Sequence, residues 1–181
     1  LNSLFIDRHL DLIVTIGAPA AQFAQRNRQR LFPTTPLLLG ILEQRRVLPD
    51  SLTANDTVLA ASVDHTDIIE NILRVRPKTT HVAVVIGNSP TEKYWLGQLQ
   101  ETFQSFQGRL AFTWLNELSF ADIEKRVEAL PPRSAVYFFL LAIDAAGIPH
   151  EEQKALSKLN AVSNSPIFSF SDSFFGHGIV G

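Results

Sequence analysis

Short apolar runs recur along the chain, and longer stretches with a helical spacing of apolar residues separate them. Most of the runs are continuous rather than alternating, and they are rich in β-branched and large apolar residues. This pattern is typical of strands that are buried on both faces, as in a parallel sheet. The predicted strands are 12–16, 36–42, 57–63, 81–86, 110–115, 135–143 and 166–170.

The stretches between these runs predict helices. Ser119 followed by Asp122 is a variant of the capping box, and Glu151 with Glu152 opens the last helix, which ends near residue 160. Strand and helix alternate almost from end to end, so we predict an α/β fold with right-handed crossovers. Three further helices are predicted over 18–32, 66–75 and 91–106.

The residues that follow the predicted strands are mostly small, amide or carboxylate residues. Open parallel sheets bind ligands at the carboxyl ends of their strands, so we expect the binding site there. The composition suits a small organic ligand held by backbone amides and aromatic faces. Strand ends are also polar simply because they meet water, and this alternative stays open for each loop. The candidate ligand-binding residues are Gly17, Ala18, Pro19, Ala20, Asp64, Asn88, Ser89, Trp95, Asn116, Asp144, Asp172, Phe174 and Phe175.

The aromatic members of this set have two interpretations. Trp95 lies one turn inside a predicted helix, where packing on the sheet is favoured over ligand contact. Phe174 and Phe175 lie in a segment rich in Ser, Asp and Gly, so one of them is expected to point into a cleft. An extended backbone would place Asp172 and Phe174 on one side, where both would contact the ligand. The alternative is that Phe174 is a core residue.

Composition excludes several classes of protein. The chain has 16 Lys and Arg against 18 Asp and Glu, a net charge of −2, which argues against nucleic acid or an anionic membrane as the partner. The longest apolar run, 135–143, is far shorter than the roughly 18 residues of a membrane-spanning helix. There is no cysteine for disulfides, metal ligation or thiol chemistry. Because the chain also lacks methionine, we expect a processed piece whose export signal or anchor lies outside it.

No catalytic or cofactor motif is complete. Residues 150–154 lack the second histidine of a zinc metalloprotease helix, and residues 17–22 lack the later glycines of a dinucleotide-binding loop. The five histidines are scattered, so neither a metal nor a cofactor is predicted. The alternative function is an enzyme that uses Asp64, Asp144 or Asp172 as acid or base.

Three segments carry a resemblance to a known fold: 11–17 (DLIVTIG), 81–89 (HVAVVIGNS) and 166–178 (PIFSFSDSFFGHG). Together with Asp64 at the head of a helix that ends at residues 76–77, they resemble the type I periplasmic binding fold. Within that fold, the chain is similar to the ABC-transporter solute-binding-like branch, which includes extracytoplasmic sensor regions of bacterial histidine kinases. The resemblance covers nearly the whole chain.

The resemblance implies two lobes, each a parallel sheet flanked by helices, that close on a ligand between them. It assigns residues 1–62 to the first lobe, 63–170 to the second, and 171–181 to the start of a return crossing. The family's first strand and helix have no counterpart before Leu1, and its final strands have none up to Gly181. The chain is therefore expected to be a partial copy of the fold.

The resemblance also implies a function. It predicts a periplasmic or extracytoplasmic binding domain that serves a membrane-bound kinase region or an ABC permease, and it leaves room for a homodimer. The helix starts after Ala18 and Ser89 offer backbone amides to a carboxylate. No arginine in the candidate set offers a bidentate clamp, so an uncharged or weakly acidic aromatic ligand is favoured over an amino acid or a dicarboxylate.

Overall fold

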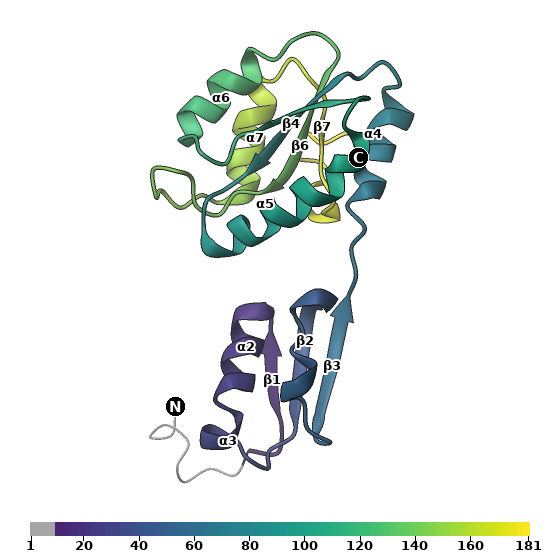
Figure 1. Ribbon diagram of the computed structural model, residues 1–181. Coiled ribbons are helices and arrows are strands. Elements are labelled where there is room, and N and C mark those ends of the chain that lie inside the picture. The colour runs from purple at the N-terminus through teal and green to yellow at the C-terminus, as the bar shows by residue number, and fades with distance from the viewer. Residues whose placement is uncertain (1–9) are drawn as a thin grey trace. The chain divides into compact units, whose positions relative to one another are not determined.

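The computed structural model describes residues 10–181, and contacts divide the chain into two compact units, Leu1–Val63 and Asp64–Gly181. The first nine residues of the predicted first lobe lie outside the described residues. In the first unit, strands and helices alternate (Figure 1). Its elements are β1 (Ile13–Ile16), α2 (Ala18–Arg26), α3 (Arg28–Leu31), β2 (Leu37–Glu43), β3 (Asp56–Ala61) and the short 3-10 helices η1 (Gln44–Arg46) and η2 (Pro49–Ser51).

The helix predicted over 18–32 is divided in two at Asn27. The backbone of Asn27 departs from helical geometry at ψ 6°, and its side-chain amide donates a hydrogen bond to the Phe23 carbonyl at 2.9 Å. Such a side-chain bond to the preceding turn competes with the helical ladder. The next residue, Arg28, begins α3, and its buried guanidinium lies 3.0 Å from the buried carboxylate of Asp56 at the start of β3.

The three strands of the first unit form a parallel sheet in the order β1-β2-β3. One face is covered, because Ala21 and Ala24 of α2 pack against buried leucines of β2. Side chains alternate along a strand, so the intervening residues point to the opposite face. Val14, Ile16 and Leu59 on that face are 51, 61 and 65% exposed. The described residues thus leave an apolar face of this sheet uncovered.

The second unit contains a four-stranded parallel sheet in the order β5-β4-β6-β7. Two separate parallel sheets flanked by helices confirm the predicted fold class. The elements of this unit are α4 (Thr66–Val75), β4 (His81–Ile86), α5 (Pro90–Thr102), η3 (Phe103–Phe106), β5 (Ala111–Trp114), α6 (Phe120–Glu128), β6 (Ser134–Leu140), α7 (Glu152–Val162), β7 (Ile167–Phe168) and η4 (Asp172–Phe174).

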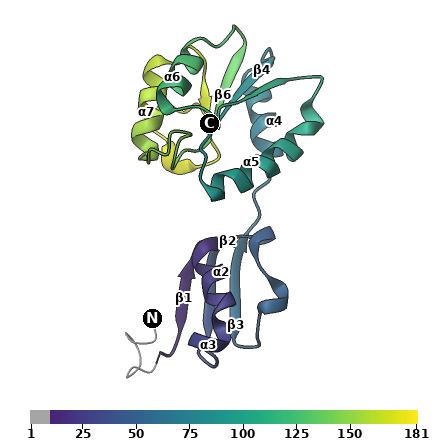
Figure 2. The same ribbon diagram turned by 60° about the vertical axis from the view of Figure 1, so that its left-hand side comes forward.

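Helices cover both faces of this second sheet. Helices α4 and α5 pack on one face, around Ile69, Leu99 and Tyr137, and helices α6 and α7 pack on the other, around Ile123 and Leu156. Figure 2 shows the two pairs of helices on opposite sides of β4 and β6. Strands β4 and β6 are almost wholly buried, which explains why their sequences are continuously apolar.

The chain's last segment lies in the second unit, beside β7. The Val180 amide donates to the Ile167 carbonyl at 2.8 Å, and the Ser169 amide donates to the Gly181 carbonyl at 2.9 Å. The expectation of an extended backbone at Asp172 and Phe174 is wrong, because residues 172–174 form the 3-10 helix η4. The interpretation of the two units as lobes joined by a return crossing stays a prediction. No helix within residues 10–181 is long and apolar enough to cross a membrane.

Candidate functional site

The loop between β4 and α5 is held by the buried carboxylate of Glu92. Ser89 caps α5, its hydroxyl accepting from the Glu92 amide at 3.3 Å, while Glu92 Oε2 accepts from the Ser89 amide at 2.8 Å. This capping box satisfies two amides that the helix start leaves unpaired. Glu92 Oε1 accepts from the Ala142 amide at 2.6 Å, beyond the end of β6. Gly87 is required here, because a Cβ at this position would overlap Glu92.

Four aromatic side chains meet at the carboxyl end of the same sheet. We call His65, Trp95, Phe139 and Phe170 the aromatic cluster. The His65 ring lies at its centre, 5.5 Å from Trp95, 5.2 Å from Phe139 and 5.8 Å from Phe170 between ring centroids, and it meets each ring edge to face. These residues come from the start of α4, from α5, from the end of β6 and from the segment after β7.

Burial differs across the aromatic cluster. His65 and Phe139 are 4% and 3% exposed, whereas Phe170 is 44% exposed and Trp95 is half-buried. Below the cluster, Tyr137 Oη lies 3.4 Å from His65 Nδ1, and burial raises the pKa of that tyrosine well above its usual range. Tyr94 meets Trp95 edge to face at 5.4 Å. The aromatic cluster therefore has a buried side, formed by His65 and Phe139, and a solvent-accessible side, formed by Phe170 and Trp95.

A half-buried carboxylate lies near Glu92. Burial raises the pKa of Glu152, and the charge of Glu92 adds to this rise, while a hydrogen bond from the Leu141 amide opposes it. Glu92 and Glu152 therefore bind the successive amides of Ala142 and Leu141. The two carboxylates fix the chain as it leaves β6.

Asp144 is enclosed in hydrogen bonds. Its carboxylate accepts from the backbone amides of Phe120, Ala146 and Ile148 at 2.9–3.0 Å, and from the His150 ring at 3.0 Å. Burial by itself raises the pKa of this carboxyl, but the hydrogen bonds from Ile148, Phe120 and His150 outweigh it and lower the pKa to about 2. Asp144 thus joins the loop before α7 to the start of α6.

The other predicted residues of the second unit differ in exposure. Asn88 and Ser89 are half-buried at the start of α5, and Asn116 is 9% exposed after β5. Asp172 is exposed on η4. The two phenylalanines separate, because Phe174 is 4% exposed in the core whereas the adjacent Phe175 is 63% exposed.

The remaining predicted residues are Gly17 to Ala20, which follow β1 in the first unit, and Asp64, at the start of the second. Gly17 has a φ of 80°, a left-handed conformation that favours glycine, and it immediately precedes α2. Ala18 is half-buried, and Pro19 and Ala20 are exposed. Asp64, the first residue of the second unit, is exposed and accepts a hydrogen bond from the Thr66 amide at 2.8 Å.

Sequence reasoning did not select three members of the aromatic cluster or Glu92. His65 follows the candidate Asp64 and Phe170 lies two residues before the candidate Asp172, so proximity to strand ends was the available signal. Phe139 lies inside a continuous apolar run, where nothing marks it as different from its neighbours. Within residues 10–181, no group of three or more histidine and carboxylate side chains is placed to hold a metal ion.

Comparison with solved structures identifies the fold. The chain is similar to a conserved domain protein from Vibrio cholerae, with 18% identity and a TM-score of 0.62 over 97% of this chain and 58% of that one. It is also similar to an ABC domain in complex with L-Trp from Streptococcus pneumonia, with 17% identity and a TM-score of 0.60 over 95% and 58%. The chain has a periplasmic-binding-like fold.

A third similar structure is a ligand-free, open substrate-binding protein with adhesive properties from Clostridium difficile, with 14% identity and a TM-score of 0.59 over 88% of this chain and 52% of that one. The chain thus spans little more than half the length of these structures and is a partial copy of the periplasmic-binding-like fold. No protein-family model and no curated protein matches the sequence.

Proposed function

We propose that this chain is the ligand-binding part of an extracytoplasmic small-molecule binding protein and that its ligand is a small aromatic compound. The observation that carries the proposal is the aromatic cluster at the carboxyl end of the second unit's sheet. Phe170 and Trp95 offer partly exposed rings, on which another ring gains both apolar burial and an edge-to-face or offset-stacked contact. The loop held by Ser89 and Glu92 supplies polar groups to fix its orientation.

The similar structures support a binding role. Two of them are described as an ABC domain with L-Trp and as a substrate-binding protein. The proposed partner is a membrane-bound kinase region, if the domain is a sensor, or an ABC permease, if it delivers a solute. The gene distinguishes the two: a following transmembrane helix and kinase region supports the sensor, whereas adjacent permease genes support transport.

The low pKa and the hydrogen bonds of Asp144 favour a binding function over acid–base catalysis. An effective general acid or base has a pKa near the working pH, whereas the pKa of Asp144 is lowered to about 2. Its hydrogen bonds to three backbone amides and His150 also hold both of its oxygens in a structural role. This buried carboxylate therefore has the properties of a loop anchor.

A thermal-shift screen tests the proposal. The panel contains aromatic acids, phenols, amino acids including L-tryptophan, sugars and phosphorylated compounds. A ligand of the folded state adds about 2.7 kcal/mol of stability at a hundredfold excess over Kd, so an aromatic compound is expected to raise Tm. Shifts from sugars or phosphorylated compounds alone would contradict an aromatic ligand.

Phe170 and Phe175, two exposed phenylalanines that lie five residues apart, provide a matched pair of variants. Phe170→Ala removes the accessible ring of the aromatic cluster and is expected to weaken binding of the aromatic compound about 5- to 150-fold, equivalent to about 1–3 kcal/mol. Phe175→Ala removes a ring that is 63% exposed and lies outside the aromatic cluster, so it should leave affinity unchanged if the aromatic cluster, rather than the earlier candidate Phe175, binds the ligand. Titration calorimetry measures both affinities. Equal affinities of the two variants would remove the aromatic cluster from the site.

A further inference from the structure

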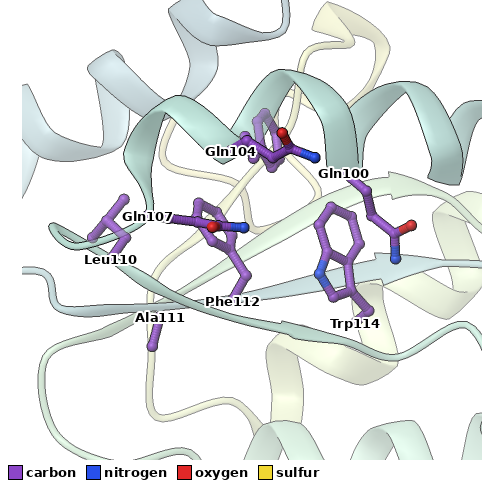
Figure 3. Close-up of a pocket in the computed structure, with 8 residues that line it drawn as sticks. Gln100, Gln104, Gln107, Leu110, Ala111, Phe112 and Trp114 are labelled. Carbon is purple, nitrogen blue, oxygen red and sulfur yellow. The ribbon is translucent and has the colours of Figure 1, made fainter.

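A pocket separate from the aromatic cluster lies along the edge of the second unit's sheet, between β5 and the helical segment formed by α5 and η3. Its volume is about 460 Å³, within the range of small-molecule sites. Figure 3 shows the rings of Phe112 and Trp114 on the strand side, the amides of Gln100 and Gln104 on the helical side, and Gln107 on the segment that follows η3. None of the proposed function's residues lines it.

The floor of this pocket is a set of nearly parallel rings. Phe112 and Trp114 are two residues apart on β5, with ring centroids separated by 6.2 Å and planes 25° apart. Phe103, almost completely buried, stacks on both of them at 5.2 and 6.0 Å, with interplanar angles of 23° and 24°. Packing against Phe103 holds the two half-buried rings in place, so they form a preformed aromatic platform.

The rim of the pocket is polar and uncharged. Gln100 lies on α5, Gln104 lies on η3, and Gln107 follows η3 in an extended conformation, and all three side chains line the pocket. Each amide has two donor hydrogens and an acceptor oxygen. No residue that lines the pocket carries a charge. A charged ligand would therefore enter without a counter-ion, at a cost in desolvation.

The open edge of β5 adds main-chain groups beside the platform. Among residues 10–181, strand β5 pairs with β4 alone, and the amides of Ala111 and Leu115 donate to β4 and the residues flanking it. Alternate residues of a parallel strand bond to the same neighbour, so the backbone groups of Phe112 and Trp114 point away from β4. The edge thus presents donors and acceptors next to the two rings.

We propose that this pocket binds a neutral saccharide of two or more pyranose rings. One face of a pyranose ring carries polarised C–H groups, which suit the negative face of an aromatic ring. Hydroxyl groups surround the ring, and they both donate and accept, as glutamine amides do. Gln100 on α5 and Gln104 on η3 are about 6–7 Å apart along the helix axis, and Gln107 lies beyond them, so the three amides span more than one sugar ring. A planar aromatic ligand has fewer polar groups and would bond to fewer of these amides.

Tryptophan fluorescence makes this pocket separately observable. The chain has two tryptophans, Trp95 in the aromatic cluster and Trp114 in the pocket. In a Trp95→Phe variant of the full chain, emission reports Trp114 alone. Maltose, cellobiose and diacetylchitobiose are the probes, and at least one is expected to change the emission saturably at millimolar concentration. Glucose 6-phosphate, adenosine and L-phenylalanine are the comparison ligands.

Single glutamine variants then test the site. Gln100→Ala, Gln104→Ala and Gln107→Ala each remove one exposed amide, so folding should be unaffected, and each should weaken disaccharide binding about three- to tenfold. Gln153→Ala, an exposed glutamine on α7, is the control and should bind normally. The proposal is overturned if no disaccharide binds, if only adenosine or L-phenylalanine changes the Trp114 signal, or if all four variants bind alike. Phe170→Ala should not affect this binding, so the two sites can fail independently.

Discussion

Replacing Phe174 with alanine should destabilise the second unit strongly. The Phe174 side chain is 4% exposed, packs in the cluster around Leu156 and Ile167, and meets Phe138 edge to face at 5.4 Å and 86°. Truncating a buried phenylalanine costs about 3–5 kcal/mol, through lost transfer energy and the cavity that remains. The lower end of this range is expected, because the short helix η4 that carries Phe174 can shift to reduce the cavity.

The two tryptophans make the measurement specific to the second unit. Both Trp95 and Trp114 lie between residues 64 and 181, so their fluorescence reports unfolding of that unit. With a typical urea slope of about 1–3 kcal/mol/M, a loss of about 3 kcal/mol lowers the urea midpoint by about 1–3 M. Phe175→Ala is the matched control, because that neighbouring ring is 63% exposed and its loss should cost at most about 0.5 kcal/mol.

The stability and the ligand affinity of Phe174→Ala together distinguish a core residue from a ligand contact. If Phe174→Ala lowers the free energy of unfolding by less than about 1 kcal/mol, Phe174 contributes little to the packing of the core. If the same variant also weakens aromatic-ligand binding tenfold, Phe174 is a ligand contact, as its position after the last strand suggested. A large loss of stability with unchanged affinity would instead establish it as a core residue.

Two further predictions concern charge and exposed apolar surface. Asp144 has a pKa of about 2 when folded and near 4 when unfolded, so its stabilisation is present above pH 4 and is lost as the pH falls toward 2. Asp144→Asn should lower stability at pH 7 and flatten the acid limb of a stability–pH profile, and an unchanged slope would refute the role given to its hydrogen bonds. The apolar face bearing Ile16 and Leu59 should cause this chain to self-associate. Sedimentation should show a shift toward monomer for Ile16→Lys with Leu59→Lys, and an unchanged distribution would show that the face is not involved.

Much of the secondary structure could be predicted from local pattern. The strand predicted over 81–86 and the helix predicted over 66–75 have the observed bounds. The capping positions of Ser89 and Ser119 were also readable, because each hydroxyl bonds an amide only three residues away. The break at Asn27 was missed, since the apolar spacing continues through it and a single side-chain bond decides it.

The candidate site depends on contacts that no local pattern specifies. His65 and Phe170 are more than 100 residues apart in sequence, yet their rings lie 5.8 Å apart. The sheet order places β7 beside β6, and Phe139 near the end of β6 contacts both His65 and Phe170. Strand periodicity is the same for any order, so the sequence pattern could not select it.

By itself, the sequence determined the alternation of strands and helices, because hydrophobic period and capping act over a few residues and leave a local signature. Tertiary structure decided which strand-end residues are accessible. Phe174 and Phe175 are adjacent and chemically identical, but one is buried against Phe138 and the other is exposed. Asp144 likewise became a loop anchor only when Phe120 and His150 were brought to it. Burial and hydrogen-bond partners are properties of the folded chain, since they depend on residues that are distant in sequence and close only after folding.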